Sequence, residues 1–524
     1  MNDKKTARIV RSGGTTAILC LGMFIVASRG FAQGAPRANQ SQTTQANPLP
    51  LSGLTGLNGS VIAVESPVAG TTTSVDTINP AVQVQGAYSG SALSTTKLPF
   101  SGKLSLREAI ERGLAYNLGA LGLSYAARQA HGQSQVARSA LLPNLNGNLT
   151  DSVQQTNLQA LGVHFNLPIP GFTFPTIVGP FSYIDLRASL SQSILDLTAW
   201  NNYRSANELY RANQFSVRDA RDLVVLAVGG AYLQVIATRE KVKSARAQFE
   251  TANALYQQNL QKRNVGLVAQ VDVNRSEVEA LAQQQRVTSL ENELAKQKIS
   301  LARMTGLPPN DEYDITDDVP FLAAPALSLD DALQQAFERR ADIKAGEAQV
   351  HAAERTLAAA RDERLPSLSV NADYGTIGAI PSQSHGTFTA AATLHVPIWQ
   401  GGRAEGDIKQ AEVSLAQCRA ELEDLKSQVE SDVRNAYLDL RAATSQVGVA
   451  QRNLQVTRET LGLTRQRFDA GVTDNVEVVQ AQEFLASAEL DVIQSIFAHN
   501  VAKLGLARSI ASAADSLQQF LSFH

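Results

Sequence analysis

Three segments of the chain alternate between apolar and polar side chains, the pattern of a strand with two different faces. In FSYIDLRASLSQ every second residue from Ile184 to Leu190 is apolar, and in GTFTAAATLHV the same holds from Phe388 onwards. PSLSVNADY alternates in the same way, and a fourth segment, LNGNLTDSV, does so more weakly. We therefore predict four strands, at about 144–157, 181–192, 367–375 and 387–396.

The apolar face of these strands needs a covering. A soluble sheet with one wet face would give the same alternation, but no second amphipathic sheet is predicted to cover it. Strands of about 10 residues with polar-in, apolar-out alternation also match a transmembrane barrel. The smallest outer-membrane barrels use about 8 strands, so four cannot close one. An open sheet edge in lipid leaves backbone groups unsatisfied, so several chains must share a barrel if these strands face lipid.

After each pair of strands the spacing of apolar residues becomes helical. Two stretches without proline, from Leu197 to about Arg263 and from Gly402 to about Asp469, each run for more than ~60 residues. A helix of that length reaches roughly 100 Å, whereas helices in globular proteins average ~11 residues. Two interpretations are open: a coiled coil that spaces two objects, or a tube of helices that continues the barrel.

The body of the chain is a tandem duplication. LSLREAIERGL from Leu104 matches LSLDDALQQAF from Leu327 at an offset of 223 residues, and the AYL at Ala231 recurs at Ala436, an offset of 205. We place the repeats at 104–326 and 327–511. Each is predicted to hold two short helices, two strands and a long helical hairpin, at 197–304 and 402–510 respectively. Because each repeat returns a hairpin after its strands, the duplication favours the tube.

The N-terminus has the features of a secretion signal. Basic residues between Lys4 and Arg11 precede the short apolar core TTAILCLGMFIVA, and small residues precede a cleavage site after Ala32. We predict that residues 1–32 are a cleaved signal peptide. Cys20 lies inside the apolar core, so we do not expect lipidation.

The segments that flank the repeats show little periodicity of apolar and polar residues. Residues 33–103 are biased towards Ser, Thr, Gly, Ala, Gln and Asn, and we predict a flexible N-terminal extension. Residues 512–524 form a C-terminal tail. No segment after the signal approaches the ~18 apolar residues that a spanning helix needs, so we expect no transmembrane helix in the mature chain.

The net charge and the motif search argue against nucleic-acid binding, metal binding and enzymatic activity. The formal net charge of -3 gives no reason to expect a nucleic-acid partner. The 7 histidines are scattered, without a metal-ligand pair at helical spacing. We find no phosphate-binding glycine loop and no nucleophile elbow. We therefore predict no metal, no cofactor and no enzymatic activity.

Two features mark the ends of the predicted tube. Trp200 and Trp399 each follow a strand pair, where a barrel would meet the helices, and aromatic residues gather at membrane interfaces. Ordinary packing explains them almost as well. The long helices are joined by short turns around Gly266 and Gly471, and glycine is what a tight turn needs.

Several motifs taken together resemble the TolC-type outer-membrane efflux proteins, over about residues 104–511. They are LPSLSV, VPIWQGGR, RNAYLDL, NVGLVAQVDV, FDAGVTDNVEVVQAQ and LARMTGLPP. The resemblance implies a homotrimer, in which three chains share a β-barrel in the outer membrane and an α-helical barrel across the periplasm. It also implies a passive exit duct. Such a duct docks onto a periplasmic adaptor protein and an inner-membrane pump of the RND or ABC type.

The resemblance assigns a role to the two turns. Val265, Gly266 and Leu267 resemble the tip motif that adaptor hairpins contact in the family. Gly471 and Val472 are the equivalent residues of the second repeat. We expect these apolar residues to be exposed because a partner covers them.

The resemblance also implies a periplasmic gate. Asp272 and Glu477 occupy matching positions in the two repeats, where a ring of carboxylates would favour cations; acids near a helix N-terminus also complement the helix dipole. Three residues depart from the family pattern: Phe468 replaces a hydrogen-bonding tyrosine, Thr473 an arginine and Gln480 an acid. We therefore expect a closed state held by less charged contacts, and a weaker preference for cations.

An alternative function is that of a periplasmic coiled-coil adaptor of the membrane-fusion class. That class needs one helical hairpin flanked by small β-domains, whereas this chain has two predicted hairpins and no such domains. The substrate stays open between a drug, a metal, another small molecule and a protein exported by type I secretion.

Overall fold

The computed structural model describes residues 60–68, 77–92, 99–160, 162, 175–308, 312–318, 321–323, 327–472, 475–511, 513–514 and 521. All of them belong to the unit Pro50–His524. The predicted signal peptide, Thr473 and most of the C-terminal tail lie outside the described residues.

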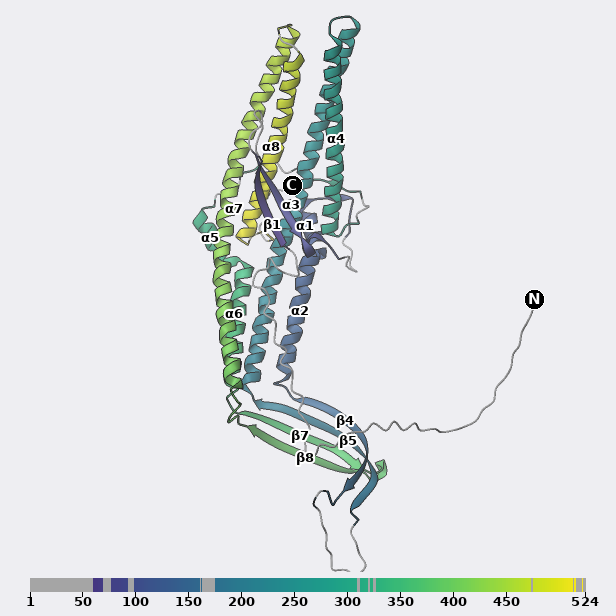
Figure 1. Cartoon of the computed structure of the whole chain (residues 1–524), viewed down its shortest axis with the longest axis vertical. Coiled ribbons are helices and arrows are strands. Elements are labelled where there is room, and N and C mark those ends of the chain that lie inside the picture. Colours follow the sequence, from purple (N-terminus) through teal and green to yellow (C-terminus); the bar gives the residue numbers. More distant parts are fainter. Residues whose placement is uncertain are drawn as a thin grey trace, which may run out of the picture. The chain divides into compact units, whose positions relative to one another are not determined.

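The two repeats have the same order of elements (Figure 1). The first contains α1 (Leu106–Tyr116), α2 (Leu118–Ser139), β4 (Asn144–Asn157), β5 (Ile177–Leu195), α3 (Leu197–Asn264) and α4 (Gln270–Thr305). The second contains α5 (Leu329–Arg339), α6 (Ala341–Asp362), β7 (Ser367–Gly378), β8 (His385–His395), α7 (Arg403–Asp469) and α8 (Asn475–Ser509). Between the repeats, β6 (Asp314–Ile315) pairs in parallel with β3 (Lys103–Leu104).

Side-chain caps fix where the helices begin. The hydroxyl of Ser105 accepts a hydrogen bond from the backbone N–H of Glu108 at 3.2 Å, and Ser328 makes the same bond to Asp331 at 3.1 Å. The carboxylate of Asp196 caps α3 through the N–H of Ala199 at 2.8 Å. Each cap satisfies a backbone donor that the helix leaves without a partner.

The strands form one antiparallel sheet in the order β4-β5-β7-β8. The register aligns the alternation of all four strands: Leu149 lies opposite Leu186, and Tyr374 opposite Phe388. Successive side chains point to opposite faces, so one face of the sheet is apolar and the other polar. β5 is longer than predicted and continues to Ile177.

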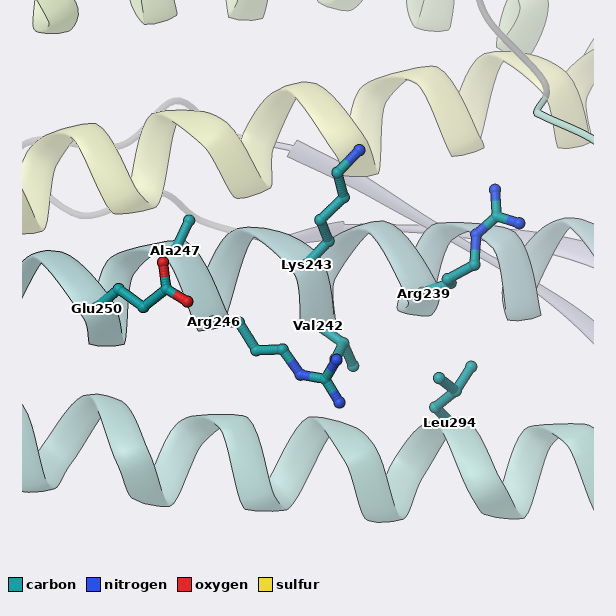
Figure 2. A pocket seen from close by; sticks show the side chains of 7 residues that line it. All are labelled: Arg239, Val242, Lys243, Arg246, Ala247, Glu250 and Leu294. Carbon is teal, nitrogen blue, oxygen red and sulfur yellow. The ribbon is translucent and has the colours of Figure 1, made fainter.

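The first hairpin is held by contacts between α3 and α4. Val242 and Arg246 point from α3 towards α4 in Figure 2, and the Arg246 Nε lies 3.0 Å from the Glu291 carboxylate of α4. A hollow of about 340 Å³ lies beside them, lined by seven residues: Arg239, Val242, Lys243, Arg246, Ala247, Glu250 and Leu294.

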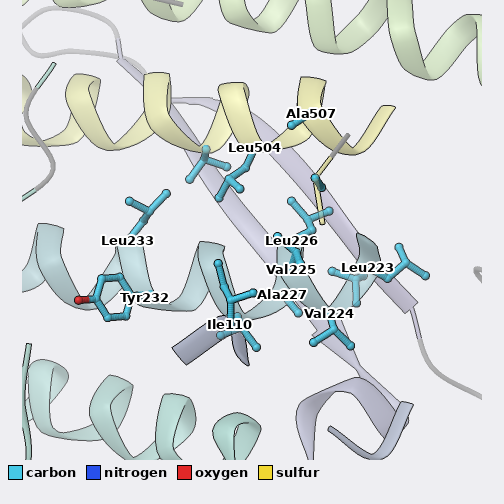
Figure 3. Close-up of a cluster of buried hydrophobic side chains, with 14 of the residues drawn as sticks. Ile110, Leu223, Val224, Val225, Leu226, Ala227, Tyr232, Leu233, Leu504 and Ala507 are labelled. Atoms are coloured by element: carbon cyan, nitrogen blue, oxygen red, sulfur yellow. The ribbon is translucent and has the colours of Figure 1, made fainter. Parts of the chain in front are cut away.

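The main hydrophobic core surrounds the middle of α3. Leu226 and Leu233 on α3 and Leu504 on α8 belong to this core, with residues from α1, α4 and α7 (Figure 3). The same stretch corrects the sequence prediction that no segment after the signal is apolar enough to span a membrane. α3 passes that test on length and hydropathy, but 83% of the apolar window is buried inside the protein. Both faces of this stretch meet other elements, so its hydrophobicity is that of a core helix.

A β-hairpin precedes the first repeat. β1 (Ser60–Val68) pairs with β2 (Thr77–Gln85), and the short helix η2 (Gly86–Ser89) follows. Tyr88 is fully buried, and the Asn117 side-chain amide donates a hydrogen bond to the Tyr88 carbonyl at 2.7 Å. This differs from the flexible extension predicted for residues 33–103, because packing onto α3 and α8 orders a segment whose own pattern is weak. Residues 33–59, 69–76 and 93–98 lie outside the described residues.

Candidate functional site: the sheet faces and the hairpin turns

The polar face of the sheet carries a network centred on Arg187. Its guanidinium contacts Asp185 on the same strand at 3.4 Å, Asp373 on β7, and the Thr387 hydroxyl on β8 at 3.2 Å. Gly375, directly opposite Arg187, has no side chain, which leaves room for the arginine to reach across β7. The network ties three strands together on a face otherwise rich in Ser, Thr and Asn.

The apolar face of the sheet is uncovered. Leu149, Leu186, Phe388 and Leu394 are all exposed, although each belongs to the apolar side of the alternation. A soluble protein rarely exposes so continuous an apolar surface. The apolar face of the sheet therefore suits contact with the hydrocarbon core of a lipid bilayer, with the polar face turned to water.

Both long hairpins turn through the same motif. At the end of α3, the Gly266 N–H donates to the Arg263 carbonyl at 2.8 Å, and the Leu267 N–H to the Lys262 carbonyl at 2.9 Å. At the end of α7, the Gly471 N–H donates to the Phe468 carbonyl at 3.0 Å, and the Val472 N–H to the Arg467 carbonyl at 2.9 Å. These paired bonds define a Schellman motif, whose C′ residue adopts a positive φ. The φ angles of Gly266 and Gly471 are 80° and 69°.

The apolar residues of both turns are exposed. Val265, Leu267 and Val472 each present most of their side chain to solvent. In the Schellman motif the residue after the glycine often packs back onto the helix, but here that position is exposed in both turns. These side chains are available for a partner.

The two predicted gate acids each have a basic neighbour in their own hairpin. Asp272, in the first turn of α4, lies 3.6 Å from Arg275. Glu477, in the first turn of α8, lies 3.4 Å from Arg467 on α7. Gln480, one turn beyond Glu477, is exposed. Both acids are also near a helix N-terminus, where their charge complements the helix dipole.

Phe468 links the two hairpins. The Lys262 ammonium of α3 lies over the Phe468 ring of α7, 4.9 Å from its centroid. A cation attracts the negative face of an aromatic ring, so this contact stands where a tyrosine would have offered a hydrogen bond. Sequence reasoning found Phe468 but missed Lys262, because the pairing depends on how the hairpins pack. It also missed Arg275, although its spacing of three residues from Asp272 was readable.

The two tryptophans differ in their surroundings. Trp200, in the first turn of α3, is half-exposed and packs near Tyr203, with ring centroids 6.2 Å apart. Trp399, between β8 and α7, is 88% exposed, and Ile398 beside it is exposed too. The described residues thus cover little of the Trp399 side chain.

The described residues offer no group of three or more His, Cys, Asp or Glu side chains that could hold a metal. The hollow between α3 and α4 is lined by side chains that already have partners, Arg239 with Asp318 and Arg246 with Glu291. Neither observation indicates a reactive centre. The sheet faces and the hairpin turns are the features that present uncovered apolar side chains and charged groups.

Comparison with known proteins agrees with these features. The family model described as "Outer membrane efflux protein" matches residues 123–307 and 332–511, one segment in each repeat. The pyoverdine export outer membrane protein OpmQ of Pseudomonas putida is 25% identical over 291 residues, which are 54% of this chain and 60% of OpmQ. The outer membrane protein TolC of Escherichia coli is 23% identical over 43% of this chain and 48% of TolC. The chain thus matches less than two thirds of the length of these relatives.

Solved structures share the fold. The Campylobacter jejuni CmeC outer membrane channel superposes with a TM-score of 0.68 at 16% identity, covering 82% of this chain and 92% of that one. The outer-membrane channel OprN gives a TM-score of 0.67 at 18% identity, covering 78% of this chain and 90% of that one. The family match spans both repeats and confirms the resemblance seen in the sequence. The chain therefore belongs to the outer membrane efflux protein family.

Proposed function

We propose that the protein is the outer-membrane exit duct of a tripartite efflux or type I secretion system. It conducts substrates passively from an inner-membrane pump, through a periplasmic adaptor, to the exterior. The observation that carries the proposal is the pair of unlike sheet faces, joined directly to helical hairpins of 68 and 36 residues and of 67 and 35 residues. The apolar face contacts lipid, and the polar face with Arg187 lines the water-filled interior.

A homo-oligomer follows from the edges of the sheet. β4 and β8 are the outer strands, and each has an edge without a partner strand in the described part of the chain. In the hydrocarbon region such an edge is too costly to leave open. Three copies joined edge to edge would close one barrel, and membership of the family supports that number.

The hairpin turns are the docking end for the adaptor. The helices α3 and α7 leave the sheet and end at the two turns, ~100 Å of helix away. If the sheet lies in the outer membrane, the turns lie deep in the periplasm. Val265, Leu267 and Val472 are the exposed apolar residues that an adaptor would cover.

The gate lies just inside the turns. In an assembled tube, Asp272 and Glu477 would bring carboxylates from every copy to one level, which favours cations over anions. Arg275 and Arg467 offset part of that charge. The Lys262–Phe468 contact holds the two hairpins of one chain together and so favours the closed tip.

Cell fractionation tests the proposed function. The protein should sediment with outer membranes and run on a gel as an oligomer that heating dissociates. A soluble periplasmic protein would overturn the proposal. The adaptor alternative has no support, because the family match covers both repeats and the family is one of outer-membrane efflux proteins.

Planar-bilayer recording tests the gate. Asp272→Ala combined with Glu477→Ala should raise the conductance and reduce the preference for cations. Glu277→Ala is the matched control, because Glu277 is an exposed acid on another face of α4. Unchanged conductance and ion selectivity in the double variant would contradict the gate assignment.

A further inference from the structure

The formally charged residues of the four-stranded sheet are few, and most of them lie in one place. The Asp, Glu, Lys and Arg residues of β4, β5, β7 and β8 are Asp151, Asp185, Arg187 and Asp373. The guanidinium of Arg187 contacts the carboxylates of Asp185 and Asp373. We call these three residues the outer cluster. The other polar residues of the same strands are Ser, Thr, Asn, Gln, Tyr and His.

The strand register places the outer cluster on the polar face of the sheet. Arg187 and the aspartate two residues before it share that face, because successive side chains of a strand alternate. Asp373 lies opposite Ser189, which is two residues beyond Arg187. Asp151, in contrast, lies opposite Ile184 and belongs to the apolar face. Within these four strands, the formal charges of the polar face therefore all belong to the outer cluster.

The outer cluster lies near the end of the sheet that is farther from the helices. β8 leads to α7 at His395, and its other end is at His385. Thr387, the β8 residue that the Arg187 guanidinium reaches, is two residues from that far end. At ~3.3 Å per residue, Thr387 is roughly 26 Å from the end of β8 next to the helices. In the proposed duct this height is the outer mouth of the barrel, at the opposite end from the hairpin turns.

The charges of the outer cluster do not cancel, and they remain accessible. Two carboxylates contact one guanidinium, which leaves one negative charge uncompensated. The side chains of Asp185, Arg187 and Asp373 are 23%, 27% and 25% exposed. A symmetric ring of copies carries the same residues at the same height. A ring of acidic charge in a pore favours cations over anions.

We infer that the outer cluster is a charge-selective level at the mouth of the duct, in which Arg187 determines how much negative charge a departing solute meets. The level favours cationic over anionic solutes. The inference rests on the proposed outer-membrane duct and adds a specificity-determining residue to it. Unlike the gate at the turns, this level does not open or close, because its residues lie within paired strands.

A role as a mere brace between strands accounts for less of the arrangement. Backbone pairing of β5 with β7 runs without a register shift from Ile184 to Ser193, so the ladder already joins the strands around Arg187. A brace would also work with equal numbers of acids and bases, whereas the outer cluster has a second aspartate. The two roles are separable, because lysine keeps the charge of an arginine but loses its planar fork.

Reversal potentials in planar bilayers under a KCl gradient test the inference. Arg187→Gln leaves both carboxylates uncompensated and should raise the ratio of K⁺ to Cl⁻ permeability roughly twofold. Asp373→Asn removes the uncompensated charge and should lower that ratio by about the same factor. The recordings are made with the wild-type tip and again in the Asp272→Ala, Glu477→Ala background. The shifts should be larger in that background, because a closed tip would dominate the resistance.

Two control variants separate charge from structure. Asp151→Asn removes a carboxylate at nearly the same height, because Asp151 is next in sequence to Thr150, the partner of Asp185. That carboxylate is on the apolar face, so the reversal potential should not change. Arg187→Lys keeps the positive charge and should also leave the reversal potential unchanged, whatever its effect on the thermal stability of the oligomer.

A further pair of variants tests the same height without altering the outer cluster. Thr389 is exposed and lies directly opposite Asp373 on the polar face. Thr389→Lys should lower the permeability ratio as Asp373→Asn does, and Thr389→Gln should leave it unchanged. These variants decide the question if the loss of Arg187 prevents assembly. All shifts should shrink between 0.1 M and 1 M KCl, because the Debye length falls from about 10 Å to about 3 Å.

The outcomes separate this inference from the proposed function. Opposite shifts in Arg187→Gln and Asp373→Asn, with none in Asp151→Asn, support the charge-selective level. Conducting variants that keep the wild-type reversal potential, or that shift it in the same direction, overturn the inference and leave the duct standing. A wild-type chain that is absent from outer membranes and does not conduct overturns the proposed function, and the inference with it.

Discussion

His499 and Lys503 illustrate at the residue scale how burial changes chemistry. Both side chains of α8 are almost fully buried, and the Lys503 ammonium donates a hydrogen bond to the Leu322 carbonyl at 3.1 Å. Burial, and then the nearby Lys503 charge, lower the pKa of His499 from 6.5 to about 4. Burial also lowers the pKa of Lys503 to about 8. Among the residues that the structure describes, neither ring nitrogen of His499 has a hydrogen-bond partner.

The first prediction concerns acid stability. Because the folded pKa of His499 lies below its unfolded value, its contribution is complete above about pH 6.5 and is lost as the pH falls towards about 4. The loss is roughly 3 kcal/mol at most. Thermal unfolding followed between pH 7 and pH 4 should show less acid sensitivity in His499→Leu than in the wild type. The exposed His131→Leu should behave like the wild type, and equal sensitivity in His499→Leu would count against the prediction.

The second prediction concerns the turn glycines. Gly471→Ala places a Cβ on a residue with φ of 69°, a conformation that costs a non-glycine residue roughly 1–2 kcal/mol. Gly462→Ala is the control, because that glycine lies inside α7 with open space around it and alanine favours a helix by about 1 kcal/mol. Hydrogen exchange should report faster opening of the turn in Gly471→Ala and no such change in Gly462→Ala. Equal hydrogen-exchange protection of the turn in both variants would contradict the predicted backbone strain at position 471.

At the element scale, the alternation and the helical spacing were readable because each depends on neighbours in sequence. The strands predicted around 144–157 and 367–375 correspond to β4 and β7, and the long helices begin within about one residue of their predicted starts. Hydropathy alone does not tell a core helix from a membrane-spanning one, and 83% of the apolar window in α3 is buried inside the protein. Only packing of α1, α4 and α8 around α3 explains why that window is so apolar.

The third prediction concerns the contact between the hairpins. Phe468→Leu removes the aromatic ring that Lys262 covers, a loss of about 0.5–1 kcal/mol at an exposed site. In the proposed duct this should shift the closed-to-open equilibrium of the tip roughly two- to fivefold towards open. Phe468→Tyr retains the ring and adds a hydroxyl that can hydrogen-bond, so its open probability should not exceed that of the wild type. Single-channel open probability measures the effect, and an unchanged value in Phe468→Leu would show that the contact does not hold the tip.

At the scale of the whole molecule, the N-terminal hairpin joins parts of both repeats. Val82 of β2 packs directly on Gly230 of α3, and the Tyr88 ring packs on Gly119 of α2. A Cβ on Gly230 would lie 2.4 Å from Val82, so the glycine makes room for the hairpin. The segment lies outside the matched family segments, yet the core helices are shaped to receive it.

The fourth prediction follows from that fit. Gly230→Ala should displace the hairpin and destabilise its docking by about 1–3 kcal/mol, the usual range for overpacking. Val82→Ala in the same chain should relieve part of the clash, because it removes the Val82 Cγ atoms but keeps the Val82 Cβ, which would lie 2.8 Å from the added Cβ. Limited proteolysis of the native protein should cut the N-terminal segment faster in Gly230→Ala than in the wild type. In the double variant the cleavage should be slower than in Gly230→Ala alone. Gly505→Ala on α8, with open space around it, is the control, and equal cleavage of all the variants would contradict the fit.

The sequence by itself determined the features that repeat or alternate along the chain. These are the duplication, the two-faced strands, the long helices and the glycine turns, because each is set by local periodicity or by the conformational freedom of one residue type. It also placed the gate candidates Asp272 and Glu477 at matching positions. That they line a gate stays a prediction, since it depends on copies that one chain does not contain.

Only the tertiary structure decided which distant residues meet. Lys262 over Phe468, Arg187 across three strands, and the N-terminal hairpin against Gly230 all join segments whose separation along the chain carries no signal. The structure also decided that Asp219 of α3 and Arg508 of α8 meet as a buried ion pair, because packing of the two repeats brings these distant residues together.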